Sequence, residues 1–190
     1  MKVLLVSEGK HESSGALETL VSRLASVEIQ CKQERVNRRD LHAHHGKGKG
    51  YFKRAMRWMS VAKKKEYDAL ILVIDEDGRS ERVREITDAQ ESEHSPVRHA
   101  LGVAIRTFDA WMLADEGALS DVLACNVPRQ RDPETIADPK DVCERLLAES
   151  EGTIRQRDMY AKVARVADIG TLEGRCPRGF APFAGRVRRL

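Results

Sequence analysis

Carboxylates follow two apolar segments of the chain, each placed directly after residues that predict a buried strand. Glu8 follows the first segment, and Asp75 and Asp77 follow the strongest apolar run. Glu12 stands four residues after Glu8, whereas Glu76 should point away from its two neighbours. Several acids at one site repel one another unless a cation neutralises them, and carboxylate oxygens suit Mg²⁺ or Mn²⁺. Together these acids predict a divalent-metal site, although each motif alone is also typical of a polar turn.

The elements that must position these acids alternate between strands and helices. The run at residues 69–74 is apolar without interruption, which is typical of a strand covered on both faces. The alternation predicts an α/β fold with a mostly parallel, roughly four-stranded, Rossmann-like sheet flanked by helices. Carboxyl ends of parallel strands share one edge, so the acids should meet there. We expect strands at 2–7, 27–36, 69–74 and 101–107, and helices at 14–26, 51–65, 80–93 and 109–123, the last as one helix or two short ones.

The last third of the chain has a different character. Helical patterns at 139–149 and 158–167 are joined by polar turns, and a short tail ends in basic residues at 186–190. A chain of 190 residues suits one well-buried domain. We therefore expect an α/β core over residues 1–125 and a helical C-terminal extension, residues 126–190, packed on the same domain.

The net charge of +3 hides a basic segment. Residues 32–65 contain 12 Lys and Arg against two acids, which suggests a phosphate-bearing partner, with a solvated surface as the alternative. Aromatic residues interleave with these cations. Base stacking is conceivable for Tyr51, whereas Phe52 and Trp58 fit core positions better. The candidate nucleic-acid contacts are Lys10, Lys47, Lys49, Lys53, Arg54 and Arg57.

Histidines and cysteines argue against a structural zinc site. His42, His44 and His45 share one Gly- and Lys-rich loop without any Cys, so contact with a polyanion is the better interpretation. The four cysteines are far apart and contain no CxxC pair. The first apolar run is too short for a signal peptide, and no segment is long enough to span a membrane. We expect a cytoplasmic protein with reduced thiols and no membrane partner.

Five short motifs follow one another along the chain: SEGKHE at 7–12, VIDED at 73–77, AIRTFDAWMLAD at 104–115, DPK at 138–140 and CPRGF at 176–180. In this order they resemble the TOPRIM (topoisomerase–primase) domain. Within that superfamily the chain looks most similar to small bacterial TOPRIM-like proteins related to the overcoming-lysogenisation-defect (OLD) nucleases. The resemblance covers nearly the whole chain, and the order of the motifs carries most of its specificity.

The resemblance implies roles for particular residues. In TOPRIM proteins the first Glu and the DxD aspartates bind Mg²⁺ and support phosphodiester chemistry, which assigns Glu8, Asp75 and Asp77 as metal ligands and catalytic residues. The related nucleases use more acids and a lysine for two metals. The matching positions are Glu12 and Asp109 as further ligands and Lys140 as a catalytic cation; the family commonly has Glu where this chain has Asp109.

The expected function is therefore a Mg²⁺- or Mn²⁺-dependent enzyme acting on nucleic-acid phosphodiesters, a nuclease. The resemblance also implies a setting in phage defence or DNA processing and a separately encoded ATPase partner. Two alternatives remain open. One is a metal-organised nucleic-acid-binding or regulatory subunit without turnover, and the other is a phosphatase or nucleotidyl transferase acting on a small substrate.

Overall fold

The strands of the molecule form one parallel sheet. The computed structural model describes residues 1–9, 14–36, 50–150, 152 and 154–190. Within these residues the sheet has four strands in the order β2-β1-β3-β4, every pair parallel. This confirms the predicted α/β fold. The strands are β1 (Lys2–Ser7), β2 (Gln30–Arg35), β3 (Ala69–Asp75) and β4 (Arg98–Ala104).

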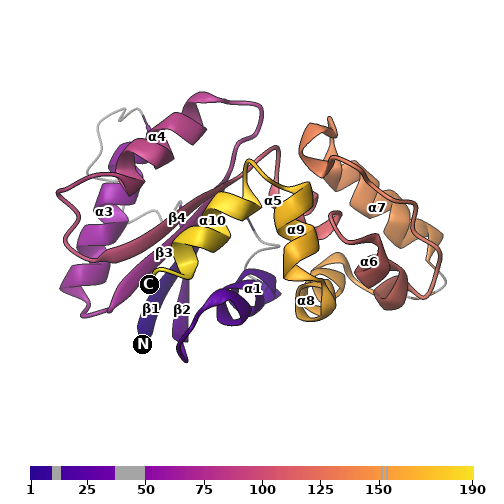
Figure 1. Cartoon of the computed structure of the whole chain (residues 1–190), viewed down its shortest axis with the longest axis horizontal. Coiled ribbons are helices and arrows are strands. Elements are labelled where there is room, and N and C mark those ends of the chain that lie inside the picture. Colours follow the sequence, from indigo (N-terminus) through magenta and orange to yellow (C-terminus); the bar gives the residue numbers. More distant parts are fainter. Residues whose placement is uncertain (10–13, 37–49, 151, 153) are drawn as a thin grey trace.

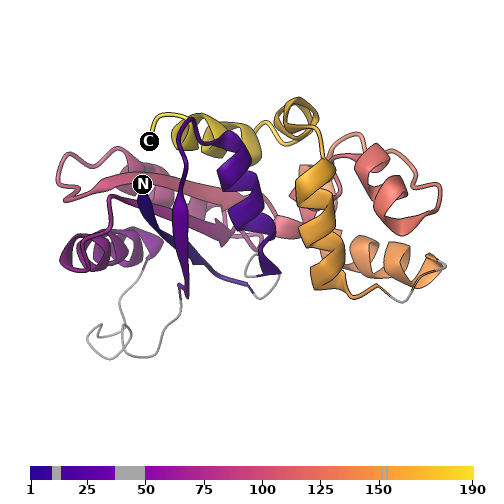
Figure 2. The same ribbon diagram turned by 90° about the horizontal axis from the view of Figure 1, so that it is seen from below.

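Helices cover both faces of the sheet (Figures 1 and 2). Successive side chains of a strand point to opposite faces. Accordingly Leu4 and Val6 of β1 belong to one buried cluster, and Val3 and Leu5 belong to the other. The first face is covered by α3 (Tyr51–Lys64) and α4 (Glu81–Gln90), and the second by α1 (Ala16–Leu24) and α10 (Phe180–Val187).

The remaining helices lie beyond the carboxyl ends of the strands, and the chain then returns across the sheet through α10 (Figure 1). Side chains of this region share the buried cluster that contains Val3 and Leu5. None of the helices that the structure describes is long and apolar enough to cross a membrane. The additional elements are α5 (Phe108–Met112), α6 (Glu116–Leu123), the 3₁₀ helix η2 (Pro133–Thr135), α7 (Pro139–Glu149), α8 (Gln156–Val166) and α9 (Ile169–Arg175).

Three elements differ from expectation or refine it. The fourth strand begins at Arg98 and ends at Ala104, three residues earlier than predicted. The segment 109–123 forms two short helices, and the side chain of Asp115 caps the second by accepting a hydrogen bond from the Ala118 amide. The segment 169–187, in which no helix was predicted, contains α9 and α10. Burial of Leu172 in α9 and of Phe180 and Phe183 in α10 stabilises helical structure in this Gly- and Pro-containing segment.

Candidate active site at the carboxyl edge of the sheet

The acids that follow β1 and β3 meet at the carboxyl edge of the sheet. The two strands are parallel neighbours with Ser7 in register with Val73, so their following residues emerge side by side. The Glu8 Oε2 atom lies 3.3 Å from the backbone nitrogen of Asp75, which donates a hydrogen bond to it. The structure therefore brings Glu8 and the Asp75–Asp77 turn together, as the parallel-sheet argument requires.

One buried guanidinium connects these acids. Arg82 lies in the first turn of α4 and is only 7% exposed. Its Nη1 donates to the Asp75 carbonyl oxygen at 2.6 Å and to Asp77 Oδ2 at 2.9 Å, and it lies 3.5 Å from Glu8 Oε2. A single cation thus neutralises carboxylates from two strand ends, which reduces their mutual repulsion.

Tyr51 anchors Glu8 from the other side. Its hydroxyl donates to Glu8 Oε1, and its backbone nitrogen donates to the Glu85 carboxylate. The guanidinium carbons of Arg54 and Arg82 lie 4.6 and 4.7 Å from the centre of the Tyr51 ring, within cation–π distance. Burial, helped by the Glu8 carboxylate, raises the pKa of Tyr51 to about 12. The ring is 9% exposed under these contacts, an arrangement that disfavours the base stacking considered for Tyr51.

The turn after β3 is shaped by backbone geometry. Asp77 adopts a left-handed conformation with φ of 52°, and Gly78 follows with φ of 67°. The Asp77 amide donates to the Arg106 carbonyl at 2.9 Å, which fastens the turn to the loop after β4. Glu76 accepts from the Arg106 amide at 3.1 Å, so its carboxylate braces that loop. The Asp77 side chain is 50% exposed and is the most accessible acid of the cluster formed by Glu8, Asp75 and Asp77.

Asp109 directly follows Phe108, whose backbone amide contacts this cluster. Asp75 Oδ1 accepts from the Phe108 amide at 2.8 Å, which positions the start of α5. The Asp109 carboxylate itself is buried and accepts hydrogen bonds from the Tyr160 hydroxyl and from Gln156 Nε2, both on α8. Burial, together with the neighbouring Cys143 and Asp109, raises the pKa of Tyr160. In these contacts Asp109 joins α5 to α8, and its metal-ligand role stays a prediction.

A hollow of about 270 Å³ opens beside Asp77. It is lined by the turn after β3, by Arg106 and Thr107, and by residues 137–139 at the start of α7. Lys140 follows these residues in the chain; its side chain is 55% exposed, with Nζ 3.7 Å from Glu144 Oε1. The DPK motif therefore lies close to the acids, although Lys140 contacts its own helix.

The predicted nucleic-acid contacts divide into two groups. Lys53, Arg54 and Arg57 lie on α3, which begins at the Glu8 contact; Lys53 is exposed and the two arginines are half-buried. Trp58 is buried, as predicted, and donates to the Val36 carbonyl oxygen at 3.3 Å. Phe52 is 36% exposed, so its assignment to the core was wrong. Outside the described residues lie Lys10, Glu12, His42, His44, His45, Lys47 and Lys49.

Within the residues that the structure describes, no group of three or more His, Cys, Asp or Glu side chains has a geometry that could hold a metal ion. The donor chemistry of Glu8, Asp75 and Asp77 nevertheless fits a hard divalent cation, since all three supply carboxylate oxygens. In the structure, the Arg82 guanidinium contacts the Glu8 and Asp77 carboxylates and the backbone carbonyl oxygen of Asp75.

Sequence reasoning missed Arg82 and Tyr160. Arg82 carried a usable signal, because a cation in the first turn of a helix that follows an acidic strand end lies close to those acids. Tyr160 carried none, since its partner Asp109 is 51 residues away in the chain.

Comparisons with protein-family models, with curated proteins and with solved structures found no match to this chain.

Proposed function

We propose that the chain is a Mg²⁺- or Mn²⁺-dependent nuclease that cleaves nucleic-acid phosphodiesters. The observation that carries the proposal is the meeting of Glu8 with Asp75 and Asp77 at the carboxyl ends of two adjacent parallel strands. The ordered motifs that resemble TOPRIM-like proteins support the same reaction. On that resemblance, the setting is phage defence or DNA processing, beside a separately encoded ATPase.

The three carboxylates are the residues that would hold the cation. When bound, a divalent cation supplies activation of water and stabilisation of the leaving oxygen. The chain's own groups prepare this arrangement: Tyr51 fixes one Glu8 oxygen, and the Phe108 amide fixes one Asp75 oxygen. Asp77 remains half-exposed and accessible to a ligand.

The polyanion would meet cations beside this cluster. α3 begins at Tyr51 and carries Lys53, Arg54 and Arg57 in its first two turns. Phosphate contacts of this kind position a nucleic acid without reading its sequence. Arg106 lines the hollow next to Asp77 and adds a further cation at the edge of the cluster.

A nuclease assay tests the proposal. Wild-type protein should cleave labelled single- or double-stranded DNA or RNA when Mg²⁺ or Mn²⁺ is added. Asp75→Asn and Glu8→Gln should lower the rate by more than about 100-fold, since loss even of groups that only orient metal ligands costs tens of fold. Asp88→Asn, an exposed acid on α4, is the matched control and should cleave like wild type. Undiminished cleavage by Asp75→Asn would contradict the assignment.

A binding module without turnover is the second candidate, and Arg82 is the observation that favours it. Its guanidinium already offsets the negative charge of Glu8 and Asp77, so these carboxylates can lie close together without a metal ion. This candidate predicts saturable, salt-sensitive nucleic-acid binding with no cleavage over long incubation. Hydrolysis of a small phosphate ester in the absence of nucleic-acid cleavage would instead indicate a phosphatase.

A further inference from the structure

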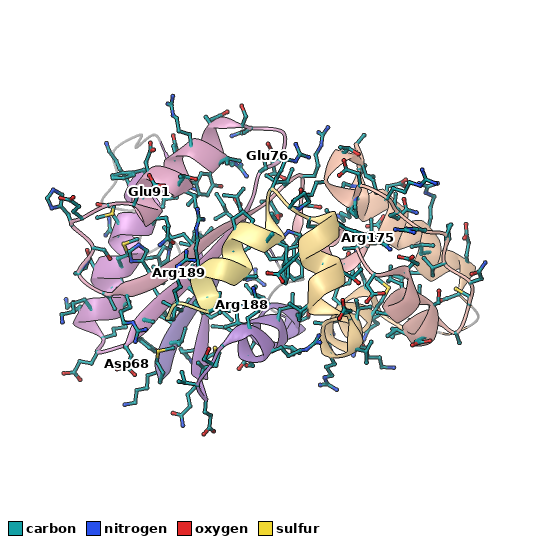
Figure 3. The ribbon with its side chains drawn as sticks, in the orientation of Figure 1. Asp68, Glu76, Glu91, Arg175, Arg188 and Arg189 are labelled. Atoms are coloured by element: carbon teal, nitrogen blue, oxygen red, sulfur yellow. The ribbon has the colours of Figure 1, made fainter. Side chains whose placement is uncertain are left out.

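A second hollow, of about 510 Å³, lies at the other end of the sheet. It is lined by Arg98 and His99 at the start of β4 and by Gln90 at the end of α4. Arg186 in the last turn of α10 and Arg189, two residues after that helix, complete the basic lining. Figure 3 labels Arg189 and Glu91 toward this amino end of the strands and Glu76 toward the carboxyl end. The hollow is therefore separate from the carboxylate cluster.

The side-chain charge of this hollow is positive. Three arginines line it, and no Asp or Glu does so among the residues that the structure describes. In the same part of the chain, none of the three forms an ion pair with a carboxylate. Burial and the neighbouring Arg189 lower the pKa of Arg186, an effect that the more distant Glu91 opposes.

Arg188 provides the contrast within the same helix end. Its Nη1 and Nη2 atoms bind the two oxygens of Glu173 at 2.6 and 3.0 Å. Among the described residues, Arg188 thus has a bidentate acid, whereas Arg186 and Arg189 form no ion pair with a carboxylate. An arginine cluster left without a protein acid is typical of a site that receives an anion.

Hydrogen bonds hold the walls of the hollow in place. Arg186 Nη1 donates to the Leu101 carbonyl oxygen at 2.7 Å, and Gln90 Oε1 accepts from the Leu101 amide at 2.8 Å. The His99 ring bridges Ser95 and the Gln90 carbonyl oxygen at 2.9 and 3.0 Å. Arg98 Nη2 lies 3.4 Å from the Arg189 carbonyl oxygen. A site whose groups are already ordered loses less entropy when a ligand binds.

We propose that this hollow binds a small phosphorylated ligand, with Arg98, Arg186 and Arg189 contacting its phosphate oxygens. Guanidinium groups pair with phosphate through parallel hydrogen bonds. The volume is in the range of small-molecule sites, and Pro96 and Val97 give one wall apolar surface. The cations surround one hollow, which suits a compact ligand. Its phosphates come either from a free polyphosphate or from a nucleotide.

Calorimetric titration of the whole chain at low salt tests this site. The probes are tripolyphosphate and ATP, both with EDTA present so that no Mg²⁺ bridges the nucleotide to Glu8, Asp75 and Asp77. Saturable binding is expected. If the hollow contacts only phosphate, tripolyphosphate and ATP should bind with equal affinity. If it also contacts the base, ATP should bind more tightly. No saturable binding of either probe would overturn the proposal.

Variants assign the binding to the hollow. Arg98→Gln and Arg189→Gln, both exposed positions, should each weaken binding by about tenfold through loss of a charge-assisted hydrogen bond. Arg188→Gln, the matched control, should bind like wild type. Asp75→Asn should also bind like wild type, so that this site and the proposed nuclease can fail separately. Equal weakening by Arg188→Gln, or saturable binding of an oligonucleotide without binding of tripolyphosphate, would contradict the proposal.

Discussion

Arg82 holds together the carboxylates on which the proposed chemistry depends. The guanidinium is buried while the Glu8 side chain is 17% exposed, so the pair is shielded from water more than a surface salt bridge is. Loss of one partner from such a pair leaves the other charge unpaired. A divalent cation held by Glu8 and Asp77 would need the carboxylate oxygens that Arg82 contacts. Arg82 and a metal should therefore compete for the acids.

Replacement of Arg82 by Gln tests that competition. We expect the free energy of unfolding, measured by urea denaturation, to fall by about 3 kcal/mol because Glu8 and Asp77 lose their cation. Added Mg²⁺ should then raise the melting temperature of Arg82→Gln by more than that of wild type. Equal Mg²⁺ shifts in the two proteins would show that the carboxylates do not take a divalent cation in place of the guanidinium.

Tyr51 gives the cluster a dependence on alkaline pH. Its pKa is raised to about 12 from the ordinary tyrosine value of 10.0, because burial and Glu8 disfavour the phenolate. A proton held more tightly in the folded state stabilises the fold below pH 10, and this contribution is lost between pH 10 and about 12. Wild type should therefore lose more stability than Tyr51→Phe across this window in pH-dependent urea denaturation. Parallel pH profiles for the two proteins would contradict the stated contact with Glu8.

At the scale of elements, a buried carboxylate fixes the start of α10. Glu134 is 1% exposed, and its two oxygens accept from the Arg178 and Gly179 amides at 3.0 and 2.6 Å. Burial raises the pKa of Glu134 while these amides oppose the rise. The CPRGF motif thus joins the start of α10 to η2, which carries Glu134. The N-terminus of a helix stabilises a negative group of this kind.

Gly179 leaves no room for a side chain at this junction. A Cβ there would lie 2.8 Å from both Glu134 Oε1 and the Val103 carbonyl oxygen. Relief of the second contact requires movement of the backbone, which costs more free energy than rotation of a flexible side chain. Gly179→Ala should lower the free energy of unfolding by about 2 kcal/mol. Gly174→Ala in α9, where a Cβ meets nothing within 4 Å, should instead stabilise by up to about 1 kcal/mol. Thermal or urea denaturation of both variants compares them, and equal effects would refute the packing argument.

The elements show what a sequence can disclose. β1, β3 and the acids that follow them were predictable because continuous apolar runs end abruptly in carboxylates. The start of β4 at Arg98 could not be predicted in this way. The strand lies at the edge of the sheet and begins with the polar residues Arg98 and His99, and its pairing partner is the distant strand β3. α9 and α10 carry Gly and Pro, so their helical form depends on tertiary burial. Arg82 and Tyr51 reach Glu8 across 74 and 43 residues, a proximity that only the folded topology creates.

At the scale of the whole molecule, an aromatic cluster connects the sheet edge to the C-terminal helices. The Trp111 ring lies 5.2 Å from Phe180 and 5.5 Å from Phe183, between ring centres, and Phe108 lies 5.4 Å from Trp111. All four rings are almost completely buried. The extension that begins at residue 126 therefore shares its core with the strands that carry the acids.

A shared core predicts one cooperative unfolding transition. Phe183→Ala should lower the free energy of unfolding by about 3 to 5 kcal/mol, because it removes a buried ring that packs on Trp111 and fits over Gly102. Circular dichroism and tryptophan fluorescence should still report a single, coincident melting transition. Trp58 and Trp111 belong to the buried clusters on opposite faces of one sheet, so the fluorescence reports on both faces. Phe52→Ala, at an exposed position, should change stability by less than about 0.5 kcal/mol. Two separate transitions would instead mean that the extension folds independently, and the acids of the carboxyl edge would then not depend on α10 for their position.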